Sequence, residues 1–204
     1  MYGIIRTHII MFLAIIGIII IKRFFGNQKK LYIVMSVFLI ILRIVSSFLP
    51  FENLFTTFDS PEAAYTYQIS KDVIKTIDGE ASTLVIGAKR NTREILIIPK
   101  IDEKHWKIGR PGESKEVGYI NLGNIGISLY RYKNTSDYYI AVDCLKTDSF
   151  TISDSENSEF VFIEKAIDTT DLTILSCYAY IPNFSKEYSV TINNNLIDLS
   201  ELLS

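Results

Sequence analysis

The chain has 204 residues, is 48% hydrophobic and carries a formal net charge of −2, from 21 basic and 23 acidic residues. Residues 1–49 contain six Lys and Arg but no Asp or Glu, whereas residues 50–204 carry 15 basic against 23 acidic residues, a net charge of −8. This balance excludes a basic nucleic-acid-binding surface in the second part, so no nucleic acid partner is expected. The acid-free apolar start argues against a chain that is soluble throughout.

Two apolar segments predict a hairpin of two transmembrane helices within residues 1–49. The first runs from about residue 2 to residue 21 and the second from residue 31 to residue 49. Each approaches the roughly 20 residues that a helix needs to cross the bilayer core. A buried pair of core helices is one alternative, which the amount of acid-free Ile and Leu disfavours. A cleaved signal peptide is the other, and no small-x-small site precedes the basic loop.

The connection between these segments, KRFFGNQKK, predicts their orientation. It contains Lys22, Arg23, Lys29 and Lys30. Short basic loops remain in the cytoplasm. Both termini, and all of residues 50–204, are therefore expected to lie outside the cytoplasm, with the chain located in the cell membrane.

Three polar residues, Arg6, His8 and Arg43, interrupt the apolar segments. At a rise of 1.5 Å per residue, His8 and Arg43 lie roughly 18–20 Å from the cytoplasmic edge, in the outer third of the bilayer. Under one interpretation Arg43 snorkels to the outer headgroups and His8 stays neutral. Under the other, the pair seeks an acidic partner, which would be Glu52, a lipid phosphate or another membrane protein.

Residues 50–70 form the predicted juxtamembrane segment. Phe51, Leu54, Phe55 and Phe58 recur at i, i+3, i+4 and i+7, which predicts the apolar stripe of an amphipathic helix. Such a stripe would lie in the headgroup region or pack under the domain that follows. An ordinary hydrophobic linker is the alternative.

Ser60-Pro61-Glu62 predicts the start of a further short helix. Ser60 suits the N-cap, Pro61 the first helical position and Glu62 the first turn. The helix is expected to end near Ile69, and the i, i+4 pair Tyr65 and Ile69 can bind the β domain that follows.

The stretch PFENLFTTFDSPEAAYTY, followed by IIPKIDEKHWKIG, resembles a family of small two-helix membrane proteins of low-GC Gram-positive bacteria. They share the form P-F-E-x-x-F-x-T-F-x-S-P-E-x-A-x-x-Y. The matching positions here are Pro50, Phe51, Glu52, Phe55, Thr57, Phe58, Ser60, Pro61, Glu62, Ala64 and Tyr67. The resemblance covers about residues 43–110. It implies a membrane location and an extracytoplasmic β-rich domain, and it implies no activity.

From residue 72 the hydrophobic period changes to two, which is typical of strands. Asp78-Gly79 predicts a hairpin turn, and residues 93–100, apolar on both faces, predict a central strand. Later strands are expected near residues 116–121, 126–133, 137–144, 149–153, 159–165, 171–180 and 187–192. This spacing predicts a mainly antiparallel, sandwich-like fold.

The loop at residues 109–115 is the best internal boundary. It separates a β meander at 71–112 from a sandwich-like region at 113–204, although 71–204 can equally form one domain. Within the second region, Tyr138, Ile140, Val142 and Cys144 are expected to share one face of a strand.

The two cysteines, Cys144 and Cys177, both fall in predicted strands. A disulfide is permitted outside the cytoplasm. The alternative is a pair of buried free thiols, because the geometry that a disulfide needs cannot be obtained from spacing alone.

Motifs for hydrolysis, phosphate binding and metal binding are missing from the sequence, so no catalytic residue, metal or cofactor is predicted. The ectodomain histidine, His105, is expected at the surface beside a core Trp106. Residues 154–159 contain three acids but lack the glycine and spacing of a calcium loop, so a solvated turn is expected.

These patterns favour a membrane-anchored extracytoplasmic binding or accessory protein of the bacterial cell envelope. Its partners would be membrane lipid and another envelope protein, a wall polymer or an incoming peptide. The alternative is an envelope enzyme that uses a pair of carboxylates, for which a deep cleft with two acids about 5–10 Å apart would be needed. The candidate binding residues are Phe51, Glu52, Phe55, Phe58, Arg43 and His8.

Overall fold

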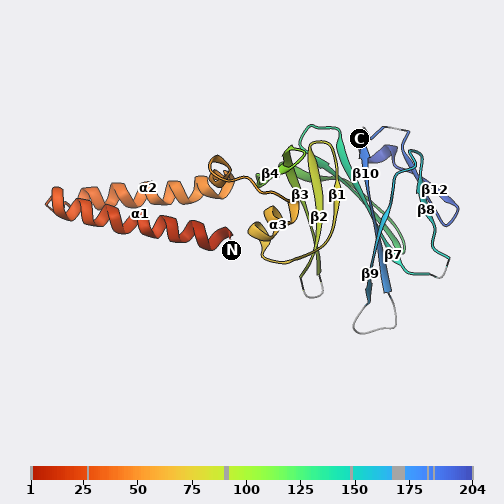
Figure 1. Ribbon diagram of the computed structural model, residues 1–204. Helices are drawn as coiled ribbons and strands as arrows, with labels where there is room; N and C mark the ends of the chain where they lie inside the picture. Colours follow the sequence, from red (N-terminus) through yellow and green to blue (C-terminus); the bar gives the residue numbers. More distant parts are fainter. Residues whose placement is uncertain are drawn as a thin grey trace.

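The computed structural model describes residues 2–26, 28–89, 92–147, 149–166, 173–182, 184–185 and 187–203. A pair of long helices projects from a β-rich domain (Figure 1). The strands of that domain form three sheets, and every described pairing between them is antiparallel. The predicted, mainly antiparallel β domain is therefore confirmed.

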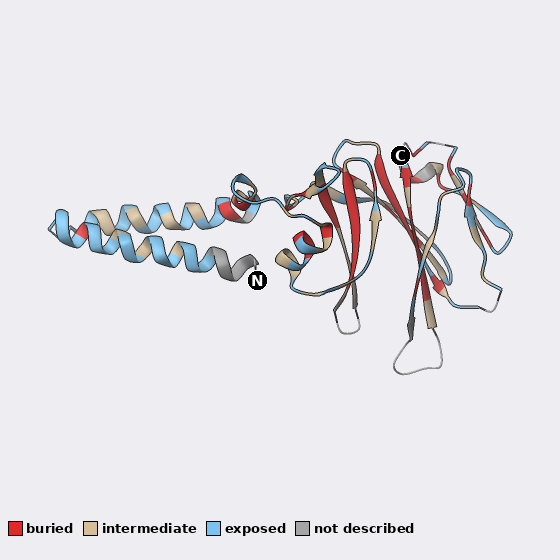
Figure 2. Cartoon of the chain, viewed as in Figure 1, coloured by how far each residue is buried: buried red, intermediate tan, exposed pale blue. Residues whose placement is uncertain are grey.

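Helices α1 (Tyr2–Phe24) and α2 (Lys29–Phe48) lie side by side, and the connection between them is at the end far from the β domain (Figure 1). Their apolar side chains are largely exposed on the protein's surface (Figure 2), and Phe12, for example, is 64% exposed. Within the described residues, one stretch, Thr7–Phe24 of α1, is long and apolar enough to cross a membrane by length and composition.

The first sheet has the strand order β1-β2-β3-β4. Its strands are β1 (Asp72–Asp78), β2 (Ser82–Lys89), β3 (Thr92–Asp102) and β4 (His105–Trp106). The predicted hairpin is confirmed, but its turn lies later than Asp78-Gly79. Asp78 ends β1 and pairs with Thr83, and the Gly79 N–H donates to the Ser82 carbonyl oxygen at 2.8 Å, so the turn residues are Glu80 and Ala81. Residues 93–100 lie in β3 and pair with β2 through Pro99, but within that range Lys100 alone has a partner in β4, so the predicted central strand is confirmed only at its end.

The second sheet has the order β5-β6-β7-β10-β9, and the third has the order β12-β11-β8. The second contains β5 (Ser114–Leu122), β6 (Ile125–Tyr132), β7 (Asp137–Leu145), β9 (Val161–Ala166) and β10 (Thr173–Pro182). The third contains β8 (Ile152–Asp154), β11 (Ser189–Ile192) and β12 (Asn195–Asp198), and the 3₁₀ helix η2 (Ser200–Leu203) follows it.

The second sheet is covered on both faces, which strand β7 illustrates because its side chains alternate between two cores. Tyr138, Ile140, Val142 and Cys144 share one face, as predicted, and join the core formed with the third sheet. Tyr139 and Ala141 lie on the opposite face. They pack in a second core with residues of the first sheet, Leu84, Ile86 and Ile97. Regions 71–112 and 113–204 thus share a hydrophobic core, and the sandwich has three sheet layers.

Helix α3 (Pro61–Ile69) covers the outer face of the first sheet. Ser60 is its N-cap and accepts a hydrogen bond from the Ala63 N–H at 3.1 Å, with Pro61 in the first turn, so the predicted helix start is confirmed. Tyr65 is fully buried and Ile69 packs beside it, as expected from their spacing. The third core consists of Ala64, Tyr65, Val85, Ile98 and Trp106, with partly buried Phe58, Ile69, Val73 and Leu96 around it.

Candidate functional site at the collar

The segment from Pro50 to Phe58, called the collar here, joins helix α2 to helix α3. It begins with one 3₁₀ turn, η1 (Phe51–Leu54), which ends where the N–H groups of Phe55 and Thr56 donate to the Glu52 carbonyl oxygen, each at 2.9 Å. The prediction of one amphipathic helix from Phe51 to Phe58 is therefore wrong. The chain leaves the helical path because Phe58 has a backbone partner in the β domain.

That partner is Trp106, with which Phe58 forms an isolated antiparallel bridge. The Phe58 N–H donates to the Trp106 carbonyl oxygen at 3.0 Å, and the Trp106 N–H donates to the Phe58 carbonyl oxygen at 2.9 Å. The Phe58 ring also packs against Tyr67 of α3, with 5.4 Å between ring centroids. The Trp106 indole N–H donates to the Thr83 hydroxyl at 3.0 Å, so the end of the collar is fixed to the first sheet.

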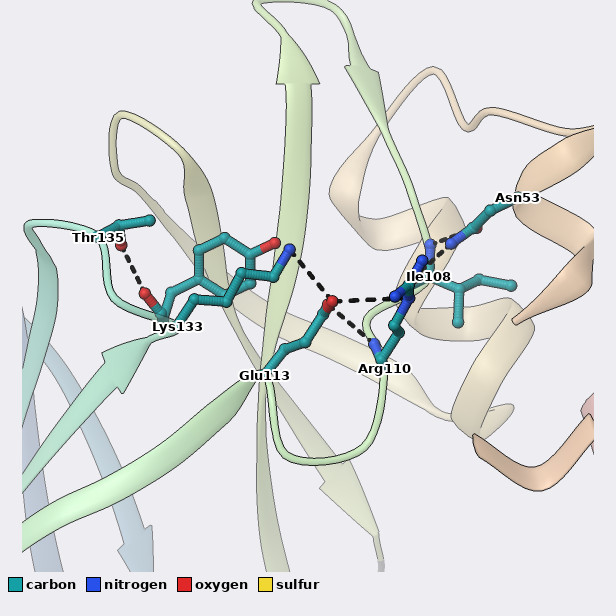
Figure 3. A network of polar contacts seen from close by, with 7 residues as sticks. Asn53, Ile108, Arg110, Glu113, Lys133 and Thr135 are labelled. Atoms are coloured by element: carbon teal, nitrogen blue, oxygen red, sulfur yellow. Dashed lines mark hydrogen bonds and ion pairs between the residues drawn. The ribbon is translucent and has the colours of Figure 1, made fainter. Parts of the chain in front are cut away.

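The start of the collar is fixed by the side chain of Asn53 (Figure 3). Its Nδ2 donates to the Ile108 carbonyl oxygen at 2.8 Å, and its Oδ1 accepts from the Ile108 N–H at 3.0 Å. The side-chain amide thus pairs with the backbone as a strand residue would. Contacts of this kind at both ends show that the collar is an ordered structure and that it packs directly on the β domain.

Glu113 holds the loop that carries Ile108 (Figure 3). Its carboxylate accepts from the Arg110 N–H at 3.0 Å and lies 3.1 Å from Nζ of Lys133, which follows strand β6. The loop between the first and second sheets is therefore linked to the collar on one side and to the second sheet on the other.

The six candidate binding residues do not form a single surface. Phe51 and Phe58 are half-buried, whereas Phe55 is 84% exposed and its neighbour Leu54 is 78% exposed. Glu52 is buried, and it has an interaction partner, as do Arg43 and His8 on the helices. The collar thus divides the predicted stripe. One end packs on the β domain, and the middle is left exposed close to the end of α2.

The disulfide that the sequence permitted is absent, and Cys144 and Cys177 are both free and buried. The two strands that carry them are neighbours, but Cys144 pairs with Leu175 and Cys177 pairs with Val142, so the thiols sit diagonally rather than opposite one another. Burial raises the pKa of the Cys177 thiol to about 12 and also raises that of Cys144. Both groups are therefore protonated and poorly reactive at neutral pH.

His105 is half-buried at the surface beside the buried Trp106, as predicted. Its Nδ1 lies 2.8 Å from the Asp102 carboxylate, and hydrogen bonds from Lys104 and His105 lower the pKa of that carboxyl. The predicted solvated turn at 154–159 is wrong at its first residue, because Asp154 ends strand β8, is buried and accepts from the Tyr188 hydroxyl at 2.6 Å. The described residues contain no group of three or more His, Cys, Asp or Glu placed to hold a metal ion.

The main polar site that sequence reasoning missed is centred on Asp137, at the start of β7. Its carboxylate is fully buried. It accepts from the Ala81 N–H at 2.9 Å, the Ser82 hydroxyl at 2.7 Å, the Tyr180 hydroxyl at 3.0 Å and the Glu80 N–H at 3.3 Å. These bonds fasten the β1–β2 turn to the second sheet. No periodic pattern signals them, because the partners lie more than 40 residues away along the chain.

Burial also raises the pKa of several tyrosine hydroxyls. It raises the pKa of Tyr180 to about 12, with the Asp137 carboxylate adding to the shift, and it raises those of Tyr139 and Tyr188. Unfolded tyrosine loses its proton near pH 10, so the folded chain keeps protons that the unfolded chain releases, and stability falls as the pH rises through about 10 to 12.

We therefore expect part of the 12 tyrosines to ionise only when the β domain unfolds. The measurement is phenolate absorbance at alkaline pH, followed together with the fluorescence of the single tryptophan, Trp106. Ionisation of every tyrosine with the Trp106 emission unchanged would contradict this expectation.

No family model, curated protein or solved structure matches the chain.

Proposed function

We propose that the chain is a membrane-anchored, extracytoplasmic binding or accessory protein of the bacterial cell envelope. Two helices would cross the membrane, with Lys22, Arg23, Lys29 and Lys30 on the cytoplasmic side and both termini outside. The helix connection and the β domain lie at opposite ends of the helical pair (Figure 1), as the positive-inside rule requires for this topology. The apolar, exposed surface of α1 supports insertion into lipid.

The observation that carries the proposal is the ordered collar. Asn53 and Phe58 dock it on the β domain five and ten residues after the end of α2 at Phe48. A flexible linker would let the β domain sample many orientations. In the proposed topology, the ordered collar holds the β domain in one orientation beside the membrane. Such an arrangement suits a domain that presents a binding surface to an envelope partner.

The alternative of a carboxylate-pair enzyme has less support. Asp78 and Glu159 do line one pocket. However, Asp78 accepts a hydrogen bond from the Thr83 hydroxyl at 2.7 Å, within the chain of contacts that holds Trp106. We therefore assign Asp78 a structural role.

The topology is tested with single cysteines in intact cells. A cysteine at Asn134, which is exposed, should react with a membrane-impermeant thiol reagent, whereas one at Asn27, outside the described residues, should be protected. The native Cys144 and Cys177 are buried, so the unmodified chain supplies the background control. Labelling at Asn27 with protection at Asn134 would refute the proposed orientation.

The exposed pair Leu54 and Phe55 is proposed to contact membrane lipid. In vesicles that contain brominated lipid, which quenches nearby indoles, the emission of a Phe55→Trp variant should be shifted to the blue and quenched. Leu196→Trp is the matched control, because Leu196 is also highly exposed (72%) but lies in the β11–β12 hairpin, away from the helices (Figure 1). Equal behaviour of the two variants would rule out this lipid contact.

A further inference from the structure

The first and second sheets do not end at the same place. Strand β1 is the edge of the first sheet and contacts β10, which is the second strand from the edge of its own sheet. Strand β9 lies one position further out, and no described strand of the first sheet lies beyond β1. Ile163 of β9 still packs in the core shared with the first sheet, so the step is open at the Val161 end of β9. A pocket of about 400 Å³ occupies this step. It is lined by Lys75, Thr76, Ile77, Asp78, Glu159, Val161 and Tyr180.

The backbone of β1 offers hydrogen-bonding groups to this pocket. In an antiparallel ladder, residues alternate between those that bond to the partner strand and those whose N–H and C=O point away from it. The bond from Gly79 to Ser82 sets this alternation, so Ile77 bonds to Leu84 while Thr76 and Asp78 point outward. These two residues line the pocket. A β-bulge between Val73 and Lys75 interrupts the strand, so the regular edge is short.

The floor and the charges of the pocket restrict what can bind. The hydroxyl of Tyr180 is bonded to Asp137, so its ring is held in place. Lys75 of β1 and Glu159, which precedes β9, both line the pocket, and among the described residues neither forms an ion pair. Residues 50–204 carry a net charge of −8, which attracts cationic molecules over longer distances.

We propose that this step is a peptide-binding groove, in which a short, extended, cationic peptide adds to the first sheet as a further strand alongside β1. The main chain of the peptide bonds to Thr76 and Asp78, as in other complexes formed by strand addition. Glu159 contacts a basic side chain of the peptide. The inference rests on the proposed function, because it names the partner class of the displayed domain.

The first test uses the full chain in detergent and a blocked hexapeptide of alternating Val and Lys, acetyl-VKVKVK-amide, with binding measured by calorimetry. The control peptide has the same sequence with alternate backbone amides N-methylated, which removes the donors on one edge. We expect the methylated peptide to bind at least about tenfold more weakly, because it loses two or more main-chain hydrogen bonds. Equal binding of the two peptides, or no binding of either, would overturn the proposal.

The second test uses variants of the groove. Thr76→Pro removes the outward N–H at an edge position where proline is tolerated, and Glu159→Lys reverses the charge. Both should weaken binding of acetyl-VKVKVK-amide, whereas Glu187→Lys, the same charge change at an exposed site outside the pocket, should bind as the unmodified chain does. Equal losses in Glu159→Lys and Glu187→Lys would overturn the assignment of the groove.

Fluorescence of Trp106 reports whether Thr76→Pro folds. If it does not, the methylated peptide and Glu159→Lys still decide the question. The thiol-labelling experiment separates the two levels of the proposal: labelling as expected with no peptide binding would refute the groove alone, whereas reversed labelling would refute the proposed topology.

Discussion

Replacing Asp137 with Ala should destabilise the β domain by about 3–5 kcal/mol, the largest loss that we expect from a single side chain. The carboxylate accepts bonds from the N–H groups of Glu80 and Ala81 and from the hydroxyls of Ser82 and Tyr180. Its removal leaves these buried or partly buried donors without an acceptor. The loss of stability is about 1–3 kcal/mol for each donor that is fully buried. Water entry through the β1–β2 turn offsets part of that sum.

The measurement is denaturant unfolding of the full chain in detergent, followed by the fluorescence of Trp106. The matched control is Asp72→Ala, since Asp72 is an exposed acid on the β1 edge, and its loss should change stability by no more than about 0.5 kcal/mol. A loss below about 1 kcal/mol in Asp137→Ala would show that the network does not fasten the two sheets.

Gly87→Ala should also be strongly destabilising, by about 1–3 kcal/mol or more. A Cβ atom at this position would lie 2.0 Å from the Tyr65 hydroxyl oxygen and 2.5 Å from Cζ of the same ring. Tyr65 is fully buried between α3 and the first sheet, so the ring can move only if α3 lifts off the sheet. The matched control is Gly126→Ala in strand β6, where the nearest atom to an added Cβ, the Tyr119 hydroxyl oxygen, lies 3.2 Å away.

The same pair of residues gives a double-mutant cycle. The Tyr65 hydroxyl is buried without a hydrogen-bond partner among the described residues, and burial raises its pKa. Tyr65→Phe should therefore be neutral or stabilising by about 1 kcal/mol, because it removes an unsatisfied polar group. It should also reduce the loss caused by Gly87→Ala, since the closest clash is with that oxygen. Strictly additive losses would contradict the close approach of Gly87 and Tyr65.

Local signals allowed much of the fold to be predicted. Ser60 and Pro61 start α3 through contacts within one turn, and the alternating pattern of strands such as 137–144 depends only on neighbours in the sequence. The division of the collar could not be predicted in this way, because Phe58 leaves the helical path for Trp106, 48 positions further along the chain. Asp137 was missed for the same reason, since a single acid beside an apolar strand gives no indication of the turn that will surround it.

The position of β10 has a consequence for the order of events during synthesis. Strand β9 is made before β10, yet β10 lies between β7 and β9 in the finished sheet. The first sheet is made earlier still, and its inner residues Leu84 and Ile86 remain uncovered until β7 and β10 arrive. Contacts between such distant parts of a chain form slowly. The nascent β domain must therefore keep an open apolar face until strand β10, residues 173–182, has been synthesised.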